Sequence, residues 1–281
     1  MTLFMNFRER SVAGGVKDPT FLEGGAETPT AGLKVISDGA VLRRTARRDV
    51  LFATHGFNVS LAEGVCSLGR LGTALNLPES CQFIGILWPG DFWIPAINYP
   101  FEGETATDCG RRLARYCNRN LRSASSISFI SHSLGARLAL QTAQVLKTKV
   151  RSICLTAAAV NSDCLTSQYA RAFANSAVVS VLASRKDSVL KLAFPIGDAF
   201  AELFHSDHSP FRPALGYSGP LSAVGATVPP WQIPDKAGYN HGDYLPPSDR
   251  AVPFPNAHAK WNEVTGFMRR SFLGQFQTWP S

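Results

Sequence analysis

Short apolar runs alternate with longer amphipathic segments along most of this chain. The runs predict buried strands at residues 50–54, 82–88, 126–131, 150–157 and 178–183. Between and after them, apolar residues that recur every three or four positions predict helices at 60–75, 104–122, 135–149, 167–176, 189–204 and 257–273. Strands joined by helices of this length need crossover connections. The pattern therefore predicts an α/β fold with a doubly wound, mostly parallel sheet flanked by helices.

Two parts of the chain lack this alternation. Residues 11–32 are rich in Gly, Pro and Thr, so residues 1–32 are expected to form a loose N-terminal arm. With no internal repeat and no linker, residues 33–281 are expected to form a single domain. Loop-rich segments on the substrate side are expected near 91–103, which follows a strand whose end should border the site, and near 205–257, because a loop that long inside a compact chain is usually functional.

The strand predicted at 126–131 runs into S-H-S-L-G, and a predicted helix follows at once. A serine at the tip of a strand–turn–helix is held on a strained backbone, where the amides at the start of the helix can face an oxyanion. Ser133 has the central place in this pattern and is the predicted nucleophile, with an ordinary turn serine as the alternative. Ser131 stands where glycine is usual, and serine tolerates a strained turn less well.

A second candidate element, H-G-F-N at 55–58, directly follows the strand predicted at 50–54. Gly56 lets the backbone approach a ligand closely, so that the amide of Phe57 can point at a carbonyl oxygen. Together with the amide of Leu134 it would form an oxyanion hole, worth a few kcal/mol per donor in acyl transfer. The alternative is a plain glycine-containing turn, and His55 is expected to have a structural role rather than to act as the base.

A nucleophilic serine needs a base and an acid from elsewhere in the chain. His241, in the run Y-N-H-G-D-Y, follows all the predicted strands and precedes a glycine. It is the favoured base, with His208 as its main rival. The acid should follow a strand beyond the nucleophile, which favours Asp187 and leaves Asp163 as the alternative.

These motifs, in this order, resemble the α/β-hydrolase superfamily over roughly residues 34–273. The resemblance is carried by H-G-F-N at 55–58, S-H-S-L-G at 131–135, K-D-S-V at 186–189 and H-G-D-Y at 241–244. Together with W-P-G at 88–90, the serine-first elbow is most similar to a poorly characterised bacterial branch of esterase/lipase-like hydrolases.

The resemblance implies a reaction as well as a fold. Ser133 would attack an acyl carbon while His241 takes its proton, and Asp187 would hold the imidazole. Water would then release the acyl group. A carboxylesterase or lipase-like serine hydrolase is expected. The alternatives are a thioesterase or peptidase of the same fold, and a non-catalytic α/β-hydrolase-like binding protein.

Aromatic residues follow the strand predicted at 82–88 and bear on the substrate. Trp88, Phe92 and Trp93 are expected to contact it, in an acyl pocket or a lid, and a loop that packs its aromatics into the core is the alternative. An apolar pocket favours an aliphatic or aromatic small-molecule ester over a highly charged substrate.

The composition of this 281-residue chain, whose formal net charge is +7, limits the classes of partner that are expected. One group of arginines repeats at helical spacing and is expected to be a solvated helix face: Arg111, Arg112, Arg115, Arg119 and Arg122. With no recognisable nucleic-acid module, no nucleic acid is expected as a partner. The six cysteines have neither C-x-x-C nor metal spacing, so no metal or other cofactor is expected and a reduced, cytoplasmic setting is the simplest interpretation. No run is long enough for stable membrane insertion, and the oligomeric state is left open.

Overall fold

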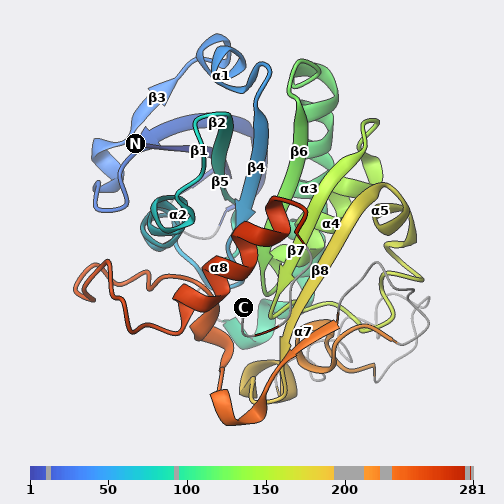
Figure 1. Ribbon diagram of the computed structural model, residues 1–281. Coiled ribbons are helices and arrows are strands. Elements are labelled where there is room, and N and C mark those ends of the chain that lie inside the picture. The colour runs from blue at the N-terminus through green and yellow to red at the C-terminus, as the bar shows by residue number, and fades with distance from the viewer. Residues whose placement is uncertain (11–13, 92–94, 193–211, 222–229, 276–278, 280–281) are drawn as a thin grey trace.

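A computed structural model of the chain describes residues 1–10, 14–91, 95–192, 212–221, 230–275 and 279, with only the backbone at 95–102 and 230–231. It contains a nine-stranded sheet in the order β3-β2-β1-β5-β4-β6-β7-β8-β9 (Figure 1). The strands are β1 (Thr2–Arg8), β2 (Val16–Gly24), β3 (Lys34–Ile36), β4 (Asp49–Thr54), β5 (Cys81–Leu87), β6 (Ser126–His132), β7 (Val150–Thr156), β8 (Ser176–Ser184) and β9 (Pro230–Ile233). In the sheet order from β1 through β5, β4, β6, β7 and β8 to β9, each strand is parallel to the next. Strand β2 alone runs antiparallel to its two neighbours, β1 and β3.

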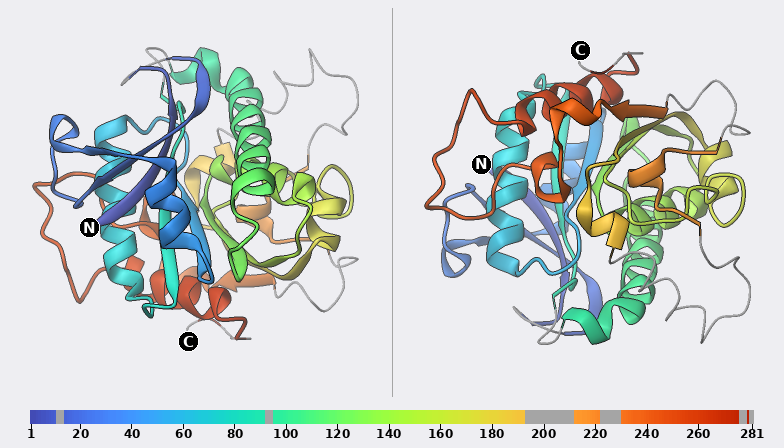
Figure 2. Two further views of the ribbon diagram at one scale, coloured as in Figure 1. Left: turned by 90° about the horizontal axis from the view of Figure 1, so that it is seen from above. Right: turned by 90° about the horizontal axis from the view of Figure 1, so that it is seen from below.

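Helices cover both faces of this sheet. They are α1 (Asp38–Thr45), α2 (Leu61–Leu75), α3 (Pro95–Asn120), α4 (Gly135–Val145), α5 (Ala170–Ala174), α7 (Leu215–Ser218) and α8 (Trp261–Phe272), with short 3-10 turns at Thr30–Gly32, Asp235–Ala237 and His241–Tyr244. Helices α2 and α8 pack on one face, and α3 and α4 pack on the other (Figure 2). The predicted doubly wound, mostly parallel architecture is confirmed.

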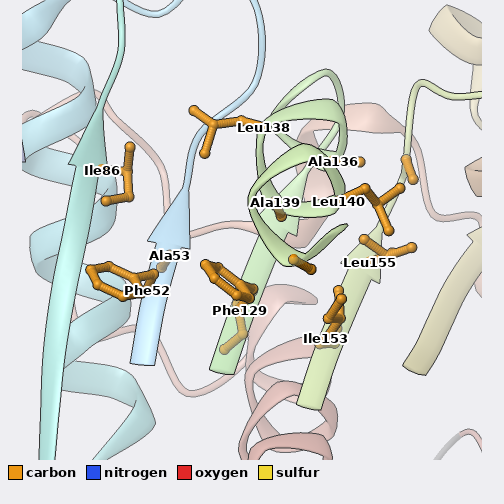
Figure 3. Packing of buried hydrophobic residues seen from close by; sticks show 14 of the residues in the cluster. Phe52, Ala53, Ile86, Phe129, Ala136, Leu138, Ala139, Leu140, Ile153 and Leu155 are labelled. Atoms are coloured by element: carbon orange, nitrogen blue, oxygen red, sulfur yellow. The ribbon is translucent and has the colours of Figure 1, made fainter. Parts of the chain in front are cut away.

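One part of the core lies between the central strands and α4, and another lies under α2 and α8, where Leu68 and Phe267 are fully buried. Phe52 of β4 and Phe129 of β6 are adjacent in register and stack with their ring centroids 5.7 Å apart (Figure 3). Leu138 and Leu140 of α4 are fully buried in the same core. Because a parallel sheet is covered on both faces, its strands are apolar almost continuously, which is the pattern that located them in the sequence.

The arginines of α3 lie where their helical spacing predicted. Arg111, Arg115 and Arg119 are exposed, while Leu113 and Ala114 on the opposite side are fully buried. Arg112 is half-buried and pairs with Asp108 one turn away, so the expected solvated face is confirmed.

The N-terminal segment corrects one expectation. A loose arm over residues 1–32 is wrong, because β1 is buried along almost its whole length between β5 and β2. Pro19 and Asp18 hid β2 from sequence analysis, since both are depleted from strands. Whether residues 33–281 behave as a single domain stays a prediction.

The two expected loop-rich segments are also partly regular. Helix α3 begins at Pro95, within the segment near 91–103, and proline is tolerated in the first turn of a helix. The segment 205–257 contributes α7 and the edge strand β9, although 205–211 and 222–229 lie outside the described residues. Of the helix predicted at 189–204, residues 188–192 are helical and 193–204 lie outside the described residues.

Candidate active site

Ser133 occupies the sharp turn between β6 and α4. Its φ of 54° lies in the left-handed region, which costs a non-glycine residue about 1–3 kcal/mol and persists only where the surrounding structure imposes it. Here its N–H donates to the carbonyl of Thr156 at 3.1 Å, and its own carbonyl accepts from the amides of Ala136 and Ala159. Backbone bonds from β7 and α4 therefore hold the strained turn.

Small residues let three backbone segments meet at this turn. A Cβ on Gly135 would lie 2.5 Å from the carbonyl oxygen of His55. A Cβ on Gly56 would lie 2.8 Å from the Cβ atom of Ser133. Ser131, at the first position of the motif, is fully buried, and its carbonyl accepts from the hydroxyl of Thr156 at 2.8 Å. A serine therefore fits at position 131, and the requirement for glycine falls on positions 56 and 135.

The structure brings Ser133, His241 and Asp187 into one hydrogen-bonded chain. Nε2 of His241 is 2.9 Å from Oγ of Ser133, and its Nδ1 is 2.8 Å from Oδ2 of Asp187. Asp187 is fully buried, and its Oδ1 accepts from the amide of Leu190 at 2.9 Å. A carboxylate can only accept, so Nδ1 of His241 carries the proton and Nε2 is left to accept from the serine hydroxyl.

Asn240 fixes the turn that presents His241. Its Oδ1 accepts from the amides of His241 and Ser188, at 2.9 and 3.0 Å, and thereby ties this turn to the loop of Asp187. Asp243, next but one after His241, accepts from the amide of Asn240 and pairs with Lys260. The role of Asn240 was not predicted from the sequence. The Asn-x-x-Asp spacing of a helix cap was its only local signal.

His132, beside the nucleophile in sequence, supports His241 from the other side. Its Nε2 donates to the carbonyl of His241 at 2.9 Å, and the two rings lie 4.9 Å apart. Burial lowers the pKa of His132 to about 3, so the ring stays neutral at ordinary pH. The His132 ring has its hydrogen bond with the His241 backbone, whereas the hydroxyl of Ser133 lies at 2.9 Å from Nε2 of His241.

The two candidate oxyanion donors come from the turns after β4 and β6. Leu134 is the N-cap residue of α4, where backbone amides have no partner within the helix. Phe57 lies between Gly56, which touches Ser133, and Asn58, whose φ of 54° is held by a hydrogen bond from its amide to the carbonyl of Gly90. Both amides are thus positioned beside the turn of Ser133 by the backbone.

His55 and Trp88 are buried residues that support the turn after β4. His55 is 1% exposed, its Nδ1 donates to the carbonyl of Gly56 at 2.9 Å, and burial lowers its pKa to about 3. The Trp88 ring stacks on it, and Nε1 of Trp88 donates to the carbonyl of His55 at 3.0 Å. His55 has the expected structural position. Trp88 corrects the expectation of a substrate contact, because a fully buried ring presents no surface to a ligand.

The remaining candidates lie elsewhere. Asp163 pairs with Arg212 at 3.6 Å, whereas the carboxylate facing His241 is that of Asp187. His208, Phe92 and Trp93 lie outside the described residues. In the described part of the chain, no three His, Cys, Asp or Glu side chains gather as a metal site, and no helix is long and apolar enough to cross a bilayer.

A strained serine between a central parallel strand and its following helix, in a sheet covered by helices on both faces, defines an α/β-hydrolase. Residues 36–210 match the model of the family described as "Alpha/beta hydrolase of unknown function (DUF900)", and the chain belongs to this family. The matched span includes Ser133 and Asp187 and ends before His241.

Three of the solved structures to which the chain is similar are esterases of low sequence identity. Esterase PE8 is 15% identical with a TM-score of 0.48, over 81% of this chain and 94% of its own. Esterase B from Lactobacillus rhamnosis is 11% identical with a TM-score of 0.44, over 90% and 84%. An esterase from Pyrobaculum calidifontis is 14% identical with a TM-score of 0.42, over 91% and 81%. No curated protein matches the chain in sequence. These identities are too low to transfer a substrate.

Proposed function

We propose that this protein is a serine hydrolase that cleaves carboxylic esters through an acyl-enzyme. The observation that carries the proposal is the chain of two hydrogen bonds, 2.9 and 2.8 Å long, that joins Ser133 to His241 and His241 to Asp187. A nucleophile, a base and a group that orients the base are the three parts that acyl transfer by serine requires.

In the proposed reaction, Nε2 of His241 takes the hydroxyl proton as Oγ of Ser133 attacks the acyl carbon. The amides of Phe57 and Leu134 donate to the oxyanion that forms. Loss of one such donor raises the activation free energy by about 3–4 kcal/mol. His241 then gives its proton to the departing alcohol. Water, activated by the same ring, breaks the ester to Ser133. Asp187 stabilises the imidazolium while remaining ionised.

The ring next to the nucleophile supports the assignment of His241 as the base. Burial lowers the pKa of His132 to about 3, which makes it a weak base, and its Nε2–H is occupied by the carbonyl of His241. It can therefore position the base without competing for the serine proton. An aliphatic or aromatic ester is the proposed substrate class. The six cysteines form no disulfide, which fits the proposal of a reducing, cytoplasmic location.

A fluorophosphonate probe tests the nucleophile. We expect the wild-type protein to be labelled at Ser133 and to hydrolyse short p-nitrophenyl esters, with both properties lost in Ser133→Ala. Ser131→Ala is the matched control. It removes a buried hydroxyl two residues away in the same motif and is expected to retain labelling.

A panel of p-nitrophenyl acyl chains, thioesters and peptide anilides then defines the leaving group and separates an esterase from a thioesterase or peptidase. A correctly folded wild-type protein that takes up no probe and hydrolyses none of these compounds would overturn the proposal. That outcome would favour a non-catalytic binding protein of this fold.

A further inference from the structure

Arg8 is a buried cation beside the candidate active site that the proposed reaction does not use. It is the last residue of β1, and it lies at the carboxyl edge of the sheet because β1 pairs in parallel with β5, with Asn6 opposite Leu87. Its side chain is 1% exposed and forms an ion pair with Asp91, whose side chain is 9% exposed. Removing two charges from water costs several kcal/mol of free energy, so the burial of this ion pair beside the site needs a physical reason.

The guanidinium joins two loops that meet at the oxyanion side of the site. Its Nη1 donates to the carbonyl of Val59 at 3.1 Å and to the carbonyl of Trp88 at 2.8 Å, while Nη2 donates to the carboxylate of Asp91. We call residues 55–59 the oxyanion loop and residues 88–91 the β5 loop. The planar guanidinium thus donates to both loops at once, a geometry that arginine provides and lysine does not.

The position of the Phe57 amide depends on the contact between these loops. Asn58 has a φ of 54°, and its amide donates to the carbonyl of Gly90. Arg8 bonds to Val59, the next residue along the oxyanion loop, and to Trp88 and Asp91, which flank Gly90 in the β5 loop. The Arg8 bonds therefore surround the Asn58–Gly90 link that keeps the peptide before Asn58 in place.

We propose that Arg8 is a positioning residue for the oxyanion hole, with Asp91 as the counterion that keeps it charged in the interior. The inference rests on the proposed function, because it concerns the transition state of that reaction. Arg8 acts through the backbone of the oxyanion loop, so it affects the stabilisation of a tetrahedral oxyanion more than the binding of a neutral ester.

The test uses the double variant Arg8→Met/Asp91→Leu. Replacing both members of a buried ion pair by apolar residues of similar size leaves no unpaired charge, so this variant is expected to fold. Arg70→Met is the matched control. Arg70 is also a 2% exposed arginine that bonds to backbone carbonyls, but these belong to Pro247 and Asp249 and not to either of the two loops.

Three measurements are made on the wild type and both variants. These are kcat and KM for a p-nitrophenyl ester, the inhibition constant of a short alkylboronic acid, and amide hydrogen exchange over residues 55–60. Removal of an oxyanion donor lowers kcat by about 100- to 1000-fold, so a displaced donor should lower it by about 10- to 100-fold. The inhibition constant should rise by a similar factor, because the boronate adduct is tetrahedral. KM should change by less than about threefold, since ground-state binding is unaffected.

Faster exchange over 55–60 in the double variant but not in Arg70→Met, together with these kinetic changes, supports the proposal. Unchanged exchange overturns it, as does faster exchange with unchanged kcat and boronate affinity. Equal losses in the double variant and in Arg70→Met would reduce Arg8 to a general stabilising residue and also overturn it. A wild type that hydrolyses no ester and binds no boronate refutes the proposed function instead, and the exchange result then still decides whether Arg8 holds the loop.

Discussion

Substitution of Asn240 by alanine would separate the loops that carry His241 and Asp187. The change removes the acceptor of the amides of His241 and Ser188, bonds of 2.9 and 3.0 Å, and the cap of the turn over His241–Tyr244. A neutral hydrogen bond contributes about 0.5–1.5 kcal/mol. The hydroxyl of Ser188 donates to the same oxygen at 3.0 Å. Because Asn240 is exposed, values at the lower end apply, and the three bonds give a loss of about 1–2 kcal/mol, in line with a lost helix cap.

The effect on catalysis should be of similar size. A loss of about 1.4 kcal/mol in the alignment of His241 with Asp187 lowers kcat about tenfold. Urea unfolding and kcat for a p-nitrophenyl ester measure the two effects separately. Asn240→Asp keeps the accepting oxygen and should restore most of kcat. Asn256→Ala is the control. It removes a similar exposed side-chain oxygen, which accepts from the amide of His258, and should leave kcat unchanged. Full kcat in Asn240→Ala despite the expected loss of stability would refute the coupling between the two loops.

Two further predictions concern packing and pH. Gly135→Ala should lower the free energy of unfolding by about 1–3 kcal/mol and abolish esterase activity, because the added Cβ would stand 2.5 Å from the carbonyl oxygen of His55. Gly242→Ala, whose Cβ meets nothing within 4 Å, is its control in the same unfolding and activity assays, and equal effects of the two would contradict the packing argument. The pKa of His55 is about 3 in the folded protein against 6.5 in the unfolded chain, so only the unfolded chain is protonated between those values and stability is lost as the pH falls from 6.5 towards 3. His55→Asn should reduce this dependence by up to about 1.4 kcal/mol per pH unit in unfolding experiments across that range, and an unchanged slope would mean that His55 is not held neutral.

The central part of the fold was predictable because its signals are local. The strands from β4 to β8 are covered on both faces and contain short apolar runs, and the longer helices between them carry apolar residues at helical spacing. The same logic failed for β2, where Pro19 and Asp18 are tolerated by a strand next to the short edge strand β3. It also failed for the start of α3, because Pro95 and Pro100 resemble a loop in sequence.

Candidate site residues were predictable where a motif joined strand, turn and helix. Ser133 and Gly56 follow strands with a recognisable turn, and the structure places both at the same edge. The expected role of Trp88 was wrong because sequence cannot distinguish an aromatic residue that faces a pocket from one that packs under it. His132 and Asn240 were missed as supports of His241, since each acts on a residue whose backbone position is set elsewhere in the fold.

The sequence alone determined the order of the strands from β4 to β8 with most of the helices between them, the strained serine turn and the residue types available for acyl transfer, because these depend on neighbours within a few positions. The tertiary structure decided which histidine and which carboxylate meet Ser133, and that Arg8, from the first strand, reaches the oxyanion loop. Those contacts join residues 50 to more than 100 positions apart. They depend on the parallel pairing of β1 with β5 and on the register of β6, β7 and β8, which no local pattern encodes.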